Sequence, residues 1–192
     1  KQVVNPREGE IMFGLNLVVH KGKTIFVADT SVHEYPSSEQ MSEMAISAAR
    51  VVRLFGFDPK VAFVSHSTFG QPVTSRTKHI KKAVDILKEK NVDFEFDGDM
   101  QPDVALNKEY KSLYPFSNIV GIANILIMPG QHSAAISYKM MKELGDTKVI
   151  GPLLIGLGLP IEIAPLRTST SELINLASIA AYSADVIDYK KS

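Results

Sequence analysis

The sequence contains no cysteine, no tryptophan and no excess of either charge. Without cysteine there can be no disulfide, no thiolate zinc site and no cysteine nucleophile. Lysine and arginine total 21, and aspartate and glutamate also total 21, so the formal net charge is zero. A nucleic-acid-binding surface needs a basic excess. We therefore expect neither nucleic acid nor a membrane surface as a partner.

Long apolar runs are also missing. The longest apolar stretch, residues 149–161, is interrupted by glycines and prolines, and it falls short of the ~18 residues that a membrane span needs. No signal peptide is expected either. These features, together with the absence of cysteine, favour a cytoplasmic location.

The 192 residues suffice for one large domain, and short apolar strands alternate with amphipathic helices along them. In the helix expected at 37–55, Ser37 and Ser38 are N-cap candidates, Glu39 lies in the first turn, and Gly56 follows as a stop. Such alternation predicts an α/β fold, a mostly parallel sheet with helices on both faces. We expect strands at residues 13–19 and 24–27 (a hairpin), 60–65, 92–96, 124–128, 149–154 and 160–163, and helices at 37–55, 75–90, 102–106, 132–144 and 171–184.

Metal chemistry has little support in this sequence. No two of the five histidines are three or four residues apart, so no helix carries a histidine ligand pair. The acidic string DGDMQPD at residues 97–103 resembles a calcium loop. However, Pro102 stands where the loop needs glycine, and Lys108 stands where it needs a bidentate glutamate. We interpret the string as a strand-to-helix turn with an acid facing the helix dipole.

Three polar strings stand at expected strand ends or helix starts: SHSTFG at residues 65–70, PGQHS at 129–133 and RTSTS at 167–171. In open α/β sheets, ligands bind beyond the carboxyl ends of strands, and helix N-termini attract anions. The three junctions favour an anionic ligand. The alternative is that the hydroxyls and His132 serve capping and packing, with Arg167 in solvent. No GxGxxG or Walker motif is present, so the usual nucleotide fingerprints are absent.

Five strings span most of the chain: FVADTSV (26–32), KVAFVSHST (60–68), DGDMQPDVAL (97–106), GIANILIMP (121–129), and AAISYK with IGPLLIG (134–139 and 150–156). In order and in spacing they resemble the strings ADxxVN, RVALLSYST, DGExQxDAAL, GxANVLIFP, and ANIxYK with GPILxG of the phosphate acetyl/butyryltransferase family. HSTFGQP at residues 66–72 is similar to YSTFGNP in one branch, the C-terminal domain of bacterial hybrid NADP-dependent malic enzymes.

The resemblance implies an isocitrate dehydrogenase-like, or phosphotransacetylase, fold of two α/β lobes with a cleft between them. It also implies a dimer partner packed alongside. Residues 1–192 would form the C-terminal portion of such a two-lobed domain. Residues 36–164 would be the second lobe, and residues 1–35 and 165–192 would supply interlobe and first-lobe elements.

The same resemblance separates ligand binding from catalysis. Active relatives carry a Ser-Arg pair just before the last helix. This chain has Pro165 and Leu166 there, with Arg167 one residue late. Losing such a group typically costs about 2.7–4 kcal/mol of transition-state stabilisation, so we expect no catalytic residue. The junctions and the resemblance together select nine residues for acyl-CoA and phosphate binding: Ser67, Thr68, His132, Ser133, Tyr138, Arg167, Thr168, Ser169 and Glu172.

The first functional hypothesis is a regulatory and oligomerisation domain of an NADP-dependent malic enzyme. It would bind acetyl-CoA or a related acyl-CoA and form a homo-oligomer, dimeric through this domain. NADP and Mg²⁺ or Mn²⁺ would belong to the malic enzyme part, which converts malate to pyruvate, and this region would need no cofactor. The alternatives are an active phosphate acetyl- or butyryltransferase that uses Arg167, and a purely structural oligomerisation module.

Overall fold

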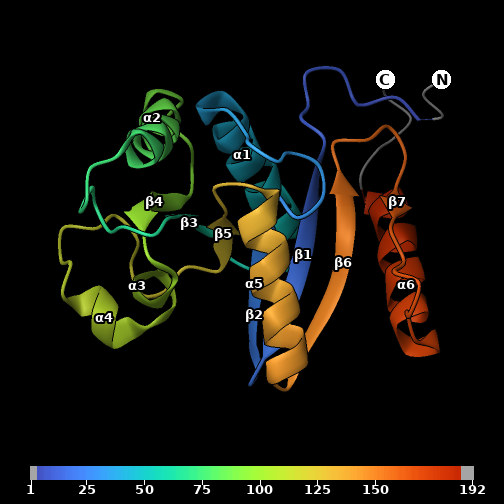
Figure 1. The fold of residues 1–192 in the computed structure, drawn as a ribbon. Helices are drawn as coiled ribbons and strands as arrows, with labels where there is room; N and C mark the ends of the chain where they lie inside the picture. Colours follow the sequence, from blue (N-terminus) through green and yellow to red (C-terminus); the bar gives the residue numbers. More distant parts are fainter. Residues whose placement is uncertain (1–3, 187–192) are drawn as a thin grey trace.

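The computed structural model describes residues 4–186, which form one mixed sheet with helices on both faces (Figure 1). This is the α/β architecture that the sequence predicts. The strands are β1 (Phe13–His20), β2 (Lys23–Ala28), β3 (Lys60–Val64), β4 (Glu95–Met100), β5 (Ile125–Ile127), β6 (Thr147–Ile155) and β7 (Ile161–Glu162). The helices are α1 (Ser38–Leu54), α2 (Ser75–Glu89), α3 (Pro102–Leu106), α4 (Lys108–Ser112), α5 (Gln131–Leu144) and α6 (Thr170–Val186).

The sheet has the strand order β4-β3-β5-β2-β1-β6-β7. Its first four strands are parallel, whereas the ladders β2–β1, β1–β6 and β6–β7 are antiparallel. The carboxyl ends of β2, β3, β4 and β5 therefore lie along one edge. The carboxyl end of β7 lies at the opposite edge, because β7 runs against β6 and β6 runs in the direction of β2.

The β1–β2 hairpin is confirmed and closes through a two-residue loop. Lys21 and Gly22 both have positive φ, 47° and 76°. Two positive values in succession characterise the type I′ turn, whose twist matches that of the flanking strands. The hairpin sets the register that pairs His20 with Lys23 and Leu15 with Ala28.

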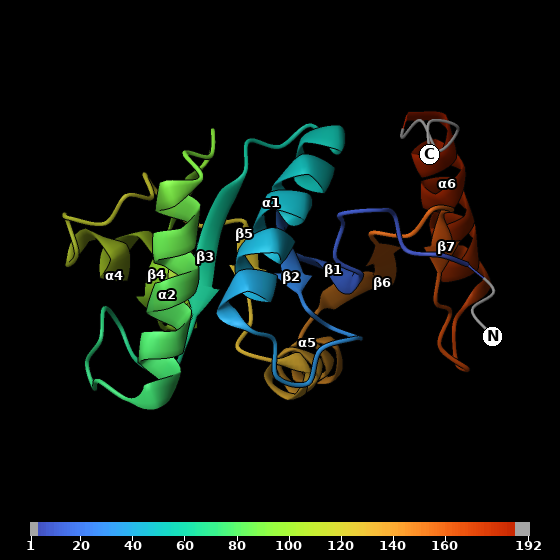
Figure 2. The same cartoon turned by 90° about the horizontal axis from the view of Figure 1, so that it is seen from above.

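Two cores cover the two faces of the sheet. In β3, Val61 and Phe63 enter the core shared with α1 and α2, whereas Ala62 and Val64 enter the core shared with α3 and α5. This alternation follows from the two-residue period of a strand. Figure 2 shows α1 and α5 on opposite sides of the sheet.

Helix α1 begins and ends as its sequence predicts. The Ser37 hydroxyl accepts from the Gln40 amide at 3.1 Å, and the Gln40 side chain accepts from the Ser37 amide at 2.7 Å. This reciprocal capping box satisfies two amides that have no partner within the helix. Phe55 is the C-cap, and Gly56 follows with φ 81°.

Strand β4 is where the expected boundaries are wrong. The apolar string predicts a strand at 92–96, but the strand runs from Glu95 to Met100 and includes the acids assigned to a turn. Asp97 and Asp99 are buried. Asp97 accepts from the Asn118 amide at 2.7 Å, and Asp99 accepts from the Gly70 amide at 3.1 Å. Loops distant in sequence supply these partners, so acidic residues are tolerated inside a buried strand.

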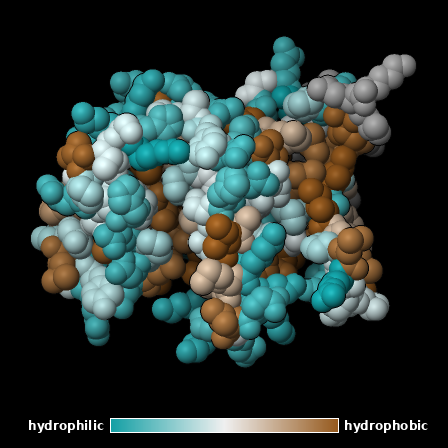
Figure 3. Space-filling model, in the orientation of Figure 1, coloured by the Kyte–Doolittle hydropathy of each residue, from teal (hydrophilic) through white to brown (hydrophobic). Residues whose placement is uncertain are grey.

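Helix α6 packs against β6 and β7 at the end of the sheet (Figures 1 and 2). Only Leu176 among its described side chains is buried, while Leu173, Ile174 and Tyr182 are exposed. Figure 3 shows apolar side chains gathered on this side of the molecule. Among the described residues, no helix is long and apolar enough to cross a membrane.

Candidate functional site

A cavity of about 450 Å³ opens at the edge of the sheet where the parallel strands end. The segments following β3 and β5 reach it, as do the loop that follows β2 and the first turns of α2 and α5. Its lining surface is mainly apolar, and this apolar floor carries a smaller share of polar groups. The lining residues are Glu34, Tyr35, Val64, Ser65, His66, Arg76, Ile80, Pro102, Met128, Pro129, Gly130, His132, Ser133 and Ser137.

A buried carboxylate organises the loop after β2 that forms one wall. Asp29 is fully buried. Its Oδ1 accepts from the amides of Gly14, Ser31 and Val32 at 2.8, 2.8 and 3.1 Å. Its Oδ2 lies 2.7 Å from both the amide and the Nδ1 of His33. The loop thereby holds a fixed path that brings Glu34 and Tyr35 to the cavity.

Three side chains from different elements form a row along the cavity. The Arg76 guanidinium lies over the Tyr35 ring, 4.8 Å from its centroid. The Tyr35 ring is stacked on His132 with centroids 6.5 Å apart, and the Nε2 of His132 lies 2.8 Å from a Glu34 oxygen. Cation–π contact orients the arginine while leaving its N–H edge available.

Ser67 and Thr68 lie buried beside this cavity and do not line it. The Ser67 hydroxyl donates to the carboxylate of Asp99 in a short hydrogen bond. The Thr68 hydroxyl accepts from the Gln101 amide at 3.3 Å. Both hydroxyls therefore join the loop after β3 to β4 and the start of α3.

A second, smaller cavity of about 110 Å³ lies between α5, β6 and the start of α6. It collects four of the predicted residues, Tyr138, Arg167, Thr168 and Glu172, together with Lys142. Burial raises the pKa of the Tyr138 hydroxyl. The polar groups here suit a small anion at Arg167 and Lys142, although Lys142 already pairs with Glu172 at 3.2 Å.

Ser169 and Glu172 form a capping box at the start of α6. The Glu172 carboxylate accepts from the amide and the hydroxyl of Ser169 at 2.7 and 2.8 Å. The Glu172 amide in turn donates to the Ser169 hydroxyl at 3.3 Å. The Ser169 bonds, followed by Lys142, lower the pKa of Glu172 to about 2.

The nine predicted residues therefore fall into separate places. His132 and Ser133 line the cavity at the strand ends, Ser67 and Thr68 are buried beside it, and Ser169 caps a helix. The remaining four line the second cavity. The sequence did not single out the cavity residues Glu34, Tyr35 and Arg76. The first two come two and three residues after the FVADTSV string, which is the signal that could have found them, whereas Arg76 has no motif around it.

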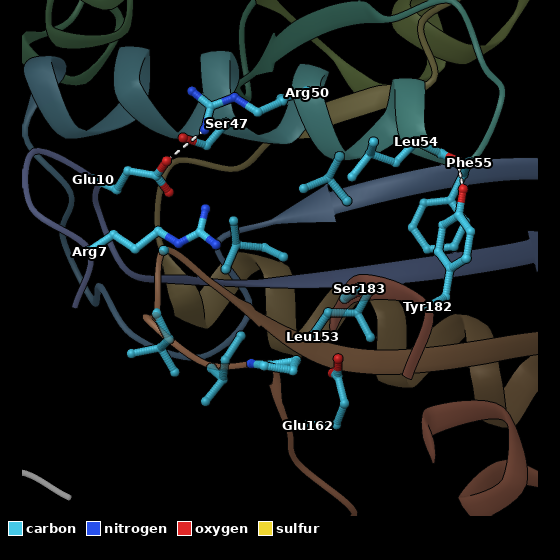
Figure 4. A pocket seen from close by; sticks show the side chains of 16 residues that line it. Arg7, Glu10, Ser47, Arg50, Leu54, Phe55, Leu153, Glu162, Tyr182 and Ser183 are labelled. Atoms are coloured by element: carbon cyan, nitrogen blue, oxygen red, sulfur yellow. Dashed lines mark hydrogen bonds and ion pairs between the residues drawn. The ribbon is translucent and has the colours of Figure 1, made fainter. Parts of the chain in front are cut away.

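A third cavity lies between α1, β6, β7 and the N-terminal segment (Figure 4). Arg50 and Glu10 form an ion pair at 2.6 Å on one side, and the Glu162 side chain points into the cavity from β7. Burial raises the pKa of Glu162 to about 8. Within residues 4–186, no group of three or more histidines and acids is arranged to hold a metal ion.

A family model and curated relatives match nearly the whole chain. The model described as phosphate acetyl/butaryl transferase matches residues 1–181. An NADP-dependent malic enzyme of Rhizobium meliloti is 45% identical over 184 residues, which are 96% of this chain and 24% of that enzyme. A phosphate acetyltransferase of Bacillus subtilis is 31% identical over 94% of this chain and 56% of its own length. The chain thus spans about a quarter of the malic enzymes that it matches.

Solved structures agree with the family model. A phosphotransacetylase from Streptococcus pyogenes superposes with a TM-score of 0.89 at 29% identity, covering 96% of this chain and 57% of its own. The EutD phosphotransacetylase from Staphylococcus aureus superposes with a TM-score of 0.86 at 25% identity, covering 94% and 57%. The fold is therefore that of the phosphotransacetylases, as the sequence strings predict.

Proposed function

This chain belongs to the phosphate acetyl/butaryl transferase family, and on that premise we propose that it is the regulatory and oligomerisation domain of an NADP-dependent malic enzyme. The domain binds acetyl-CoA or a related acyl-CoA and has little or no acyltransferase activity of its own. The rest of the parent enzyme oxidatively decarboxylates malate to pyruvate in the cytoplasm. NADP and a divalent metal, Mg²⁺ or Mn²⁺, act in that part, outside this chain.

The observation that carries this proposal is the cavity at the carboxyl ends of the parallel strands. It combines an apolar floor, hydroxyls, two imidazoles and a guanidinium. This mixture suits a ligand with an apolar acyl chain, a thioester and phosphate groups. Of the nine residues selected from the sequence, His132 and Ser133 remain the proposed contacts in this cavity. Tyr138, Arg167, Thr168 and Glu172 remain proposed contacts in the second cavity. Ser67, Thr68 and Ser169 support the site through their bonds within the protein.

The expected lack of acyl transfer is supported by the segment before α6. Pro165 and Leu166 replace the Ser-Arg pair of active relatives, and Leu166 is fully exposed. Arg167 lines the second cavity, away from His132 and Ser133. Positive groups aimed at the developing charge are usually the largest contribution to such catalysis, and Pro165 and Leu166 supply none.

Regulation requires that acetyl-CoA bind two states of the assembly with different affinities. Exposed apolar side chains on α5 and α6 support an assembly role, among them Ile136, Met140, Leu144 and Ile174. Surfaces of this kind commonly mark contacts between proteins. The homo-oligomer proposed here is dimeric through this domain and larger in the parent enzyme.

Three measurements on the intact protein test the proposal. Calorimetry with acetyl-CoA tests binding, and malate-dependent NADP reduction with and without acetyl-CoA tests regulation. A thiol-release assay with acetyl-CoA and phosphate tests transfer. We expect binding and an altered malate rate without transfer. Turnover at ordinary enzyme rates would instead establish an active acyltransferase, and absence of binding would leave a structural module.

A further inference from the structure

We propose that Arg76 is the phosphate-binding residue of the cavity at the strand ends. This inference rests on the acyl-CoA-binding function proposed above and names a residue that the sequence did not indicate. Its basis is the contrast between Arg76 and the other polar groups of the cavity wall. Four of those groups, on Glu34, Ser65, His132 and Ser133, are already bonded within the protein.

Several of the neighbouring polar side chains have hydrogen-bond partners. The Ser133 hydroxyl donates to the Gly130 carbonyl at 2.8 Å, and the Ser65 hydroxyl accepts from the Ser67 amide at 3.3 Å. Glu34 is the one carboxylate among the lining residues, and it lies 2.8 Å from the Nε2 of His132. These groups shape the cavity, but their existing hydrogen bonds leave fewer donors and acceptors for a ligand.

Arg76 differs from these groups because it is positively charged and is not in an ion pair within the described residues. It is the only lysine or arginine among the lining residues. Within the described part of the chain, no carboxylate lies within 4.0 Å of its guanidinium, and its contact there is the Tyr35 ring at 4.8 Å. A guanidinium carries five N–H donors in a planar fork that matches phosphate oxygens.

Tyr35 makes this arginine more effective as an anion receptor. Long side chains lose rotamer freedom when they bind, and that loss weakens binding. A guanidinium resting on an aromatic face has given up part of this freedom already. A guanidinium stacked on a ring can still donate from its planar edge to a ligand. Asp29 holds the backbone of this loop as far as His33, two residues before Tyr35, so the loop leads the tyrosine to the arginine.

The shared ligand chemistry is a phosphate group, which either an acyl-CoA or inorganic phosphate can provide. The experiment titrates the intact wild-type protein and Arg76→Ala with acetyl-CoA, with S-acetylpantetheine and with inorganic phosphate. S-Acetylpantetheine keeps the acyl thioester and lacks the phosphates. Loss of a charge-assisted hydrogen bond weakens binding about 10- to 100-fold. We expect that loss for acetyl-CoA and a change under about twofold for S-acetylpantetheine.

The variants separate a bound phosphate from a structural effect. Arg76→Lys keeps the charge without the fork, so we expect an intermediate loss of about 3- to 10-fold. Tyr35→Phe keeps the ring and should bind as the wild type does, whereas Tyr35→Ala should weaken acetyl-CoA binding. Lys78→Ala is the matched control, because Lys78 is an exposed cation two residues further along α2 that does not line this cavity.

The outcomes also separate this inference from the proposed function. A loss confined to inorganic phosphate would place the free anion at Arg76 and still support the inference, even if acetyl-CoA did not bind at all. Binding of acetyl-CoA and of phosphate that Arg76→Ala leaves unchanged would overturn the inference and leave the proposed function standing. Equal weakening of acetyl-CoA and S-acetylpantetheine, or no binding of any ligand, would also overturn it.

Discussion

Replacing Asp29 by asparagine tests how the fold builds the wall of the cavity. The aspartate is fully buried, and its two oxygens accept four backbone amides and approach one imidazole nitrogen. Asparagine has nearly the same shape but only one acceptor oxygen. If that oxygen keeps the three amides on the Oδ1 side, the new amide group faces the amide of His33, donor against donor.

The magnitude follows from the bonds that are lost. A hydrogen bond to a charged group contributes about 1.5–3 kcal/mol, and a buried donor left without a partner costs about 1–3 kcal/mol more. The imidazole of His33 can change its tautomer and accept from the new amide, which offsets part of this cost. We therefore expect Asp29→Asn to lower the free energy of unfolding by about 3 kcal/mol, a large share of the usual 5–15 kcal/mol.

Urea denaturation followed by circular dichroism measures this change. With a slope of about 2–3 kcal/mol per molar urea, the midpoint should fall by about 1 M. Asp93→Asn is the control, because the Asp93 side chain is 79% exposed and, within the described residues, its ion pair is with the solvent-facing Arg53. Its loss should stay within about 0.5 kcal/mol. Because the loop also carries Tyr35, Asp29→Asn should weaken acetyl-CoA binding too. A midpoint unchanged within about 0.2 M would refute this account of the loop.

Three further changes have defined outcomes. A Cβ at Gly130 would lie 2.3 Å from the Glu34 carbonyl oxygen, so Gly130→Ala should abolish acetyl-CoA binding in calorimetry. The control is Gly121→Ala, whose new Cβ would meet no atom within 4 Å. This control should cost only about 1 kcal/mol of backbone strain. Arg167→Ala should weaken acetyl-CoA binding by about 1–3 kcal/mol if a phosphate reaches the second cavity, and unchanged affinity would remove this arginine from the site. Burial raises the pKa of Glu162 from 4.5 to about 8. Between pH 4.5 and pH 8 the folded state therefore holds a proton that the unfolded chain releases. The free energy of unfolding falls as the pH rises through this range. In urea denaturation, Glu162→Gln should be more stable than the wild type by about 1–3 kcal/mol at pH 8 and equal to it near pH 4.5. Equal stability of the two proteins at both pH values would contradict the burial of this carboxyl group.

Local sequence predicts most elements of this fold because most of them are determined locally. The 37–55 helix carries its own cap, its apolar face and its glycine stop, and the observed α1 differs from it by one residue at each end. Strand β4 fails for the opposite reason. Its acids are held by amides of Gly70 and Asn118, which come from loops that no short window of sequence brings together.

The three polar junctions were predicted at strand ends or helix starts, but only two of them meet. The strings after β3 and β5 reach one cavity because those strands are parallel neighbours in the sheet. The string at 167–171 follows β7, which runs in the opposite direction at the end of the sheet. Strand direction depends on the order of pairing, so the sequence pattern alone could not place this junction.

Most hydroxyls that the sequence analysis selected as ligand contacts make hydrogen bonds within the folded protein. Ser67 is bonded to Asp99, Thr68 to Gln101, and Ser169 to Glu172. A sequence pattern locates polar groups but not their partners, and a ligand can use only the donors that the fold leaves free. Arg76 shows the converse: nothing around it in sequence marks a site, yet Tyr35, 41 residues earlier, holds its guanidinium at the cavity. Its proposed role in ligand binding therefore depends on a contact that exists only once the chain has folded.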